Sequence, residues 1–122
     1  MIYRAAFTPR SYTARLWLIP EIRLITSVYA IDEARRNLIS DEHHERLTEL
    51  LAVVDVRDDD LRPLPDWVIL PEKDRPILEG AIAARATHLL TNDRRHFGCY
   101  FWQIVEGITI LPSSVYLKRK LL

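Results

Sequence analysis

Residues His88–Gly98 read HLLTNDRRHFG, and this stretch decides the fold. Its short apolar beginning predicts a buried β-strand over Thr87–Thr91. Asn92 and Asp93 follow at the C-terminal end of that strand. In open α/β sheets, ligands bind beyond the carboxyl ends of the strands. The stretch therefore predicts a strand and, directly after it, an acidic residue at the edge where such a fold binds its ligand.

Strand and helix patterns alternate along the rest of the chain. Further strands are predicted at Glu21–Thr26, Val53–Val56 and Gly107–Leu111. Helices are predicted at Ala14–Leu18, after Ser27, after Ser40 or Asp41, at Lys73–Thr87 and at Ser113–Leu121. Arg57–Val68 is polar and proline-rich and is predicted to be a loop. This alternation indicates an α/β fold with a parallel sheet and helices on both faces.

The composition predicts one domain over residues 1–122, with 48% apolar and 28% charged residues. The chain has 17 Lys and Arg against 17 Asp and Glu, so an RNA partner would need a local basic patch. A single cysteine, Cys99, is typical of a reducing compartment. No apolar run approaches the ~20 residues of a membrane helix, and the N-terminus does not read as a signal peptide. We therefore expect a cytoplasmic protein with no membrane partner.

Three acidic residues fall near predicted strand ends, namely Glu33, Asp74 and Asp93. Carboxylates that converge on one point repel one another unless a cation joins them, and hard oxygen ligands favour Mg²⁺ or Mn²⁺. The pattern also has a simpler interpretation. Asp74 is where a helix cap is expected, and Glu33 is on a helix face that solvent can cover. Spacing alone leaves both interpretations open.

Four segments resemble motifs of the PIN family of metal-dependent ribonucleases. Leu24–Ser27 (LITS) with Ala30–Leu38 (AIDEARRNL) resembles the second motif, whose glutamate is a metal ligand. Leu70–Leu78 (LPEKDRPIL), with the alanine-rich Ala81–Ala84, resembles the third, in which an aspartate opens a helix. His88–Gly98 resembles the fourth, and Gly107–Pro112 resembles the closing strand. The resemblance covers nearly the whole chain.

The resemblance implies a three-layer α/β/α fold that hydrolyses RNA phosphodiester bonds with Mg²⁺ or Mn²⁺. It implies that Glu33, Asp74 and Asp93 are the catalytic and metal-binding acids. The polar residues that support them would be Ser27, Thr91 and Asn92. Many PIN proteins are toxins of toxin–antitoxin pairs, so the resemblance also implies an antitoxin partner and a homodimer.

Three basic residues, Arg94, Arg95 and His96, follow Asp93 directly and could contact RNA phosphates. Surface salt bridges are the alternative role for all three. Trp17, Trp67 and Trp102 could stack on bases, although packing is the commoner role of tryptophan. His43 and His44 are adjacent, so on a helix their side chains diverge by about 100° and do not form a two-ligand face.

The N-terminus departs from the family pattern. PIN domains open with a central strand that ends in an aspartate, commonly as Asp-x-Asn, whereas the first acidic residue here is Glu21. Ile2–Pro9 resembles the segment that follows that aspartate. A start assigned too late would explain the difference. Genuine loss would instead leave a catalytically inactive domain that binds RNA or protein. Either way we expect a gap in the sheet, with Ile2–Phe7 near the first helix or drawn into the gap as a makeshift strand.

Overall fold

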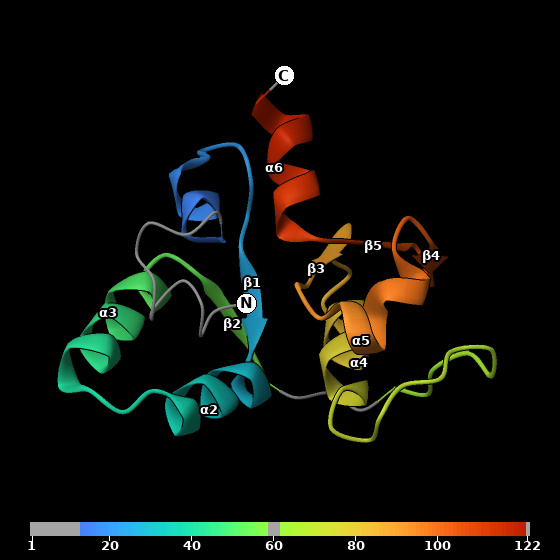
Figure 1. Ribbon diagram of the computed structural model, residues 1–122, viewed down its shortest axis with the longest axis horizontal. Helices are drawn as coiled ribbons and strands as arrows, with labels where there is room; N and C mark the ends of the chain where they lie inside the picture. Colours follow the sequence, from blue (N-terminus) through green and yellow to red (C-terminus); the bar gives the residue numbers. More distant parts are fainter. Residues whose placement is uncertain (1–12, 59–61, 122) are drawn as a thin grey trace.

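The computed structural model describes residues 13–58 and 62–121 and shows a mixed α/β protein with small, largely parallel sheets (Figure 1). Along the chain the elements are η1 (Thr13–Leu18), β1 (Ile25–Ser27), α2 (Val28–Asn37), α3 (Asp41–Leu51), β2 (Asp55–Arg57), α4 (Arg75–Ala83), β3 (His88–Leu90), α5 (Arg94–Phe97), η2 (Gly98–Tyr100), β4 (Ile104–Val105), β5 (Ile108–Leu111) and α6 (Ser113–Leu121). The prediction for Ile2–Phe7 lies outside the described residues. No helix in the described part is long and apolar enough to cross a membrane.

The four expected strands are present, although each is shorter than the pattern predicted. β1 pairs with β2 and β3 pairs with β5, both in parallel. A further strand, β4, was not predicted and pairs antiparallel with β5 through a tight turn. Glu106 and Gly107 form that turn with φ angles of 50° and 82°. Two successive positive φ angles are typical of the hairpin turns whose twist matches that of the strands they join.

Within the described residues the strands form two separate sheets, β1–β2 and β3–β5–β4. Helix α4 contacts both β1 and β3 and so links the two. Helix α4 packs closely on the end of β1, since a Cβ added at Gly80 would lie 3.7 Å from the Cβ of Ser27, an ordinary van der Waals contact. One helix therefore holds the ends of β1 and β3 near each other, and the N-terminus of that helix lies beside them.

The core has two parts. One packs η1 against α2 and α3 through Ala14, Ala34, Leu38, Leu47 and Leu50. The other contains Leu64, Val68, Leu70, Leu78, Phe97, Tyr100, Val105 and Ile110. Residues 62–68 of the proline-rich segment form a loop as predicted, whereas Arg57 belongs to β2, and Leu64 and Val68 pack in this second part. The Tyr100 hydroxyl holds this loop there, because it accepts from Ile69 N at 2.6 Å and donates to Ile69 O at 3.1 Å.

The helix ends follow local capping rules. The Ser27 hydroxyl accepts from Ala30 N at 3.2 Å, and the Ser40 hydroxyl accepts from His43 N at 3.1 Å, so Ser40 rather than Asp41 caps α3. Helix α4 is shorter than the predicted Lys73–Thr87. It ends because Arg85 takes a φ of 55° and the following amide, Ala86 N, bonds back to Ala81 O at 3.1 Å.

Asp55, the first residue of β2, forms salt bridges with two arginines that should make the stability of the fold depend on pH. Arg57 and Arg23 donate to the Asp55 carboxylate and lower its pKa from 3.8 to about 2. A lowered pKa in the folded state stabilises the fold at pH values above about 4, and this contribution is lost as the pH falls toward 2. We expect the urea midpoint of the wild type to exceed that of Asp55→Asn above pH 5. The difference should shrink between pH 4 and pH 2 and weaken in high salt. Parallel pH profiles would contradict this role for Asp55.

Candidate metal centre

The segment after β3 forms the short helix α5, and the Asp93 side chain caps the N-terminus of that helix. The Thr91 hydroxyl accepts from Asp93 N at 3.2 Å, which bends the chain as the strand ends. Asp93 then caps α5, because its Oδ1 accepts from His96 N at 3.1 Å. Phe97 is buried in the core and anchors the other side of this helix. Asp93 therefore has a fixed orientation before any long-range contact is considered.

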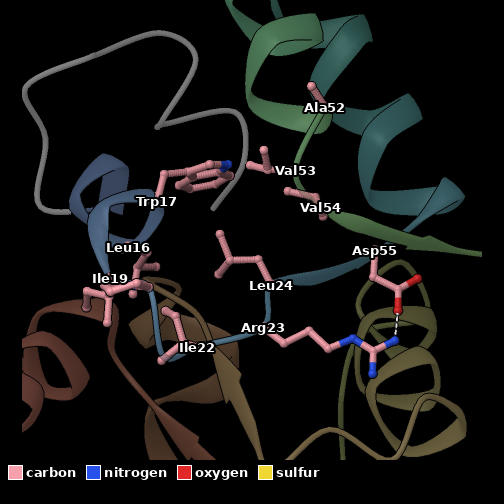
Figure 2. Close-up of a pocket in the computed structure, with 11 residues that line it drawn as sticks. Leu16, Trp17, Ile19, Ile22, Arg23, Leu24, Ala52, Val53, Val54 and Asp55 are labelled. Atoms are coloured by element: carbon pink, nitrogen blue, oxygen red, sulfur yellow. Dashed lines mark hydrogen bonds and ion pairs between the residues drawn. The ribbon is translucent and has the colours of Figure 1, made fainter.

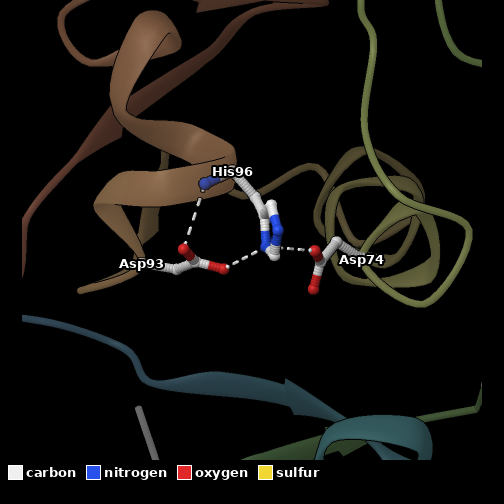
Figure 3. A group of neighbouring side chains, drawn as sticks. All are labelled: Asp74, Asp93 and His96. Atoms are coloured by element: carbon white, nitrogen blue, oxygen red, sulfur yellow. Dashed lines mark hydrogen bonds and ion pairs between the residues drawn. The ribbon is translucent and has the colours of Figure 1, made fainter.

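Asp74 approaches the same point from a different element. It directly precedes α4 and makes no side-chain capping bond there. Figure 3 shows the His96 ring between the two carboxylates. The Nδ1 atom of His96 is 2.9 Å from Oδ2 of Asp93 and 2.9 Å from Oδ2 of Asp74. Two acids separated by nineteen residues in sequence thus share one imidazole nitrogen.

The shared nitrogen leaves Asp74 short of hydrogen-bond donors. An imidazole Nδ1 carries at most one proton, and the hydrogen bond to Asp93 uses it. Asp74 is only 6% exposed, and its Oδ2 is buried with no hydrogen-bond partner. A buried, unpartnered carboxylate oxygen is costly, because it has lost water without gaining a donor. The contact with His96 offsets this cost only when the ring is protonated.

Asp93 is held in its charged form. Partial burial would raise its pKa, but hydrogen bonds from the backbone and ring of His96, and the charge of that ring, together lower it below the ordinary value. The site therefore presents an ionised Asp93 beside the buried Asp74 carboxyl. Such a pair favours a cation that both oxygens can share.

The potential ligand atoms of Asp74, Asp93 and His96 are close enough to share one cation. One atom each of Asp74, Asp93 and His96 lies within 4.8 Å of the other two, so the three residues could hold a metal ion. The sequence patterns indicated the two aspartates as ligands, whereas His96 was predicted only as a candidate contact of RNA phosphates. A signal was available, because the third residue of a helix lies beside its N-cap, as in a capping box. A histidine three residues after a capping aspartate is therefore placed to share a ligand with it.

The other predicted site residues occupy different places. Glu33 is half-buried on α2 and is not part of this group. Ser27 caps α2, and Thr91 braces Asp93 as described above. The Asn92 amide donates to Thr13 at 3.1 Å and accepts from the Ser113 hydroxyl at 2.9 Å. Asn92 thus ties the end of β3 to η1 and α6.

Two exposed cations lie next to the group on α5. Arg94 and Arg95 are exposed, and neither forms a salt bridge with any residue that the structure describes. They would suit an anionic ligand that approaches the two aspartates. A shallow depression of about 690 Å³ is lined by Tyr29 and by residues near Asp74 in the sequence, namely Glu72, Lys73, Arg75, Pro76 and Glu79. Its two cations are balanced by two acids, and Arg75 pairs with Glu79 at 3.9 Å.

A second hollow, of about 650 Å³, lies away from this group (Figure 2). It is lined by Leu16, Trp17, Ile19, Pro20, Ile22, Arg23, Leu24, Ala52, Val53, Val54 and Asp55. Its two charged side chains, Arg23 and Asp55, pair with each other. The hollow is otherwise apolar and offers no free acid or nucleophile to a ligand.

No protein-family model, curated protein or solved structure matches this chain.

Proposed function

We propose that the chain is a metal-dependent ribonuclease domain of the PIN type, with a three-layer α/β/α arrangement. One observation carries the proposal, namely the unpartnered buried Oδ2 of Asp74 beside the ionised Asp93. The motif resemblance supports it independently, because it assigns metal binding to the same two aspartates. The proposed substrate is RNA, with Arg94 and Arg95 drawing its phosphates toward the site.

The donor set fits Mg²⁺ or Mn²⁺. Asp74 and Asp93 would supply carboxylate oxygens, and a shared cation would give Asp74 Oδ2 the partner it lacks. His96 either gives up its Nδ1 proton and becomes a ligand or keeps the proton and orients Asp93. An imidazole ligand favours Mn²⁺ over Mg²⁺, which prefers oxygen. When bound, such an ion lowers the pKa of a coordinated water and stabilises a charged phosphoryl transition state.

A second candidate is a catalytically inactive PIN-type domain that binds RNA or protein. One observation favours it, because Glu33 lies outside the group formed by the two aspartates and His96. Two carboxylates could still hold a cation yet position it too loosely for catalysis. The antitoxin partner and the homodimer remain proposals that rest on the resemblance alone.

Metal binding is tested by the stability of Asp74→Asn. Without metal, the variant should be more stable than the wild type by about 1–3 kcal/mol, because the amide needs no counter-charge in its buried position. With Mn²⁺ at about 100 times its dissociation constant, the wild type should gain about 2.7 kcal/mol. The variant should gain little. Chemical denaturation with EDTA or with Mn²⁺ measures all four values.

Glu72→Gln is the matched control, since Glu72 is an exposed acid two residues before Asp74. It should respond to Mn²⁺ as the wild type does. Equal responses of Asp74→Asn and the wild type to Mn²⁺ would refute a cation site at Asp74. Mn²⁺ binding without any RNA cleavage would instead favour the inactive domain.

A further inference from the structure

The C-terminal part of this neutral protein carries an excess of positive over negative charge. Residues 94–122 contain five Lys or Arg and a single acid, Glu106. Three of the five, Lys118, Arg119 and Lys120, are consecutive and exposed at the end of α6. None of them forms a salt bridge with another described residue. The end of α6 therefore presents uncompensated positive charge.

These cations lie over aromatic rings. The guanidinium carbon of Arg119 is 5.4 Å from the ring centroid of Trp102, and Lys120 Nζ is 5.7 Å from that of Tyr116. The Tyr116 ring meets His88 edge-on, with 5.0 Å between centroids. We call this surface the basic–aromatic face and define it by His88, Trp102, Tyr116, Arg119 and Lys120.

Trp102 is exposed and has a strained backbone conformation. Its φ of 68° is in the left-handed region, which bulky residues rarely adopt. The bond from Trp102 N to Ile110 O, at 2.8 Å, keeps it there. The side chain nevertheless remains 59% exposed. Core packing therefore does not account for the strained position of this ring.

The basic–aromatic face is separate from the candidate metal centre. His88 is the first residue of β3, whereas Asp93 comes three residues after its last residue, so the two lie at opposite ends of that strand. Burial and the nearby charges of Arg119 and Lys120 lower the pKa of His88, which keeps its ring neutral at neutral pH. The face thus combines two neutral rings, one exposed indole and two cations.

We propose that the basic–aromatic face binds single-stranded nucleic acid, with Arg119 and Lys120 on phosphates and Trp102 stacked on a base. Proteins that bind single strands without sequence preference combine cations with exposed aromatic rings, because every base has a π-face and every phosphodiester group has a negative charge. An acidic protein segment would use the cations but would leave the strained, exposed Trp102 without a role. The proposal does not depend on metal binding or cleavage.

The test uses Asp93→Asn protein in EDTA, so that neither metal nor cleavage contributes. Fluorescence anisotropy of labelled twelve-nucleotide oligo(U) and of its DNA counterpart measures affinity. Trp102→Leu should weaken binding between about fivefold and a hundredfold, the usual range for one stacked base. Arg119→Gln should reduce the slope of log affinity against log salt by about 0.7, as expected for one lost phosphate contact.

Two matched controls lie elsewhere on the surface. Trp67→Leu removes another exposed tryptophan, and Arg36→Gln removes an exposed arginine of α2. Both should bind oligo(U) as the parent protein does. Weaker binding to the DNA oligonucleotide than to oligo(U) would indicate that the face prefers RNA. Equal binding would indicate that it accepts any single strand. If Trp102→Leu does not fold, Arg119→Gln alone decides.

Three outcomes would overturn the proposal. The first is that the face variants and the control variants bind oligo(U) equally. The second is that polyglutamate competes as well as oligo(U) at equal charge, which would indicate an acidic protein partner. The third is equally tight binding to vesicles of anionic lipid. Because the assay contains no metal, none of these outcomes bears on the proposed ribonuclease activity.

Discussion

Replacing Asp93 with Asn is expected to reduce Mn²⁺-dependent RNA cleavage by about a hundredfold to a thousandfold, the usual effect of removing one group that stabilises transition-state charge. The substitution removes the charge that would hold the cation. It should preserve the fold, because Asn caps helices as well as Asp does and Oδ1 can still accept from His96 N. Gel assays with a labelled RNA, in Mn²⁺ and in EDTA, measure the loss.

The control for this experiment is Asp32→Asn, since Asp32 is an exposed acid on α2. It should cleave RNA at the wild-type rate. Asp93→Asn should also melt within a few degrees of the wild type, which would separate lost chemistry from lost structure. Metal-dependent cleavage by purified Asp93→Asn at the wild-type rate would falsify the assignment of Asp93 as a ligand.

Phe97→Ala is expected to destabilise the protein by about 3–5 kcal/mol, the usual cost of removing a buried phenyl ring. Phe97 is 1% exposed and packs in the part of the core that also contains Leu78 and Ile110. That loss is a large fraction of the ~5–15 kcal/mol that stabilises a typical domain. Urea denaturation, followed by tryptophan fluorescence, measures it.

The same variant should also weaken Mn²⁺ binding. Helix α5 has four residues, too few to be stable without tertiary packing, and Phe97 is its buried anchor. Without that anchor, Asp93 and His96 lose their fixed positions relative to Asp74. Phe97→Leu keeps an apolar side chain there and should show a smaller loss of both stability and Mn²⁺ affinity. A Phe97→Ala variant as stable as the wild type would contradict this account of α5.

Short-range features were predictable from the sequence. The apolar runs that predicted β1, β3 and β5 are local, and so are the caps at Ser27 and Ser40. Each depends on contacts within a few residues, which a pattern records directly. The strand β4 was missed because a two-residue strand has too few positions to show alternation. Helix α4 was predicted too long because its end depends on the left-handed conformation of Arg85, which its residue type does not announce.

The sequence by itself determined the alternation of strands and helices, and with it the placement of Asp93 after a strand and of Asp74 before a helix. Only the tertiary structure decided which acids meet. Helix α4 contacts both β1 and β3, which brings Asp74 to Asp93 and His96 and leaves Glu33 outside the group. It also decided that Arg119 lies over Trp102. The physical reason is that distances between side chains on different elements are set by how helices and strands pack, and packing depends on the whole core rather than on any local pattern.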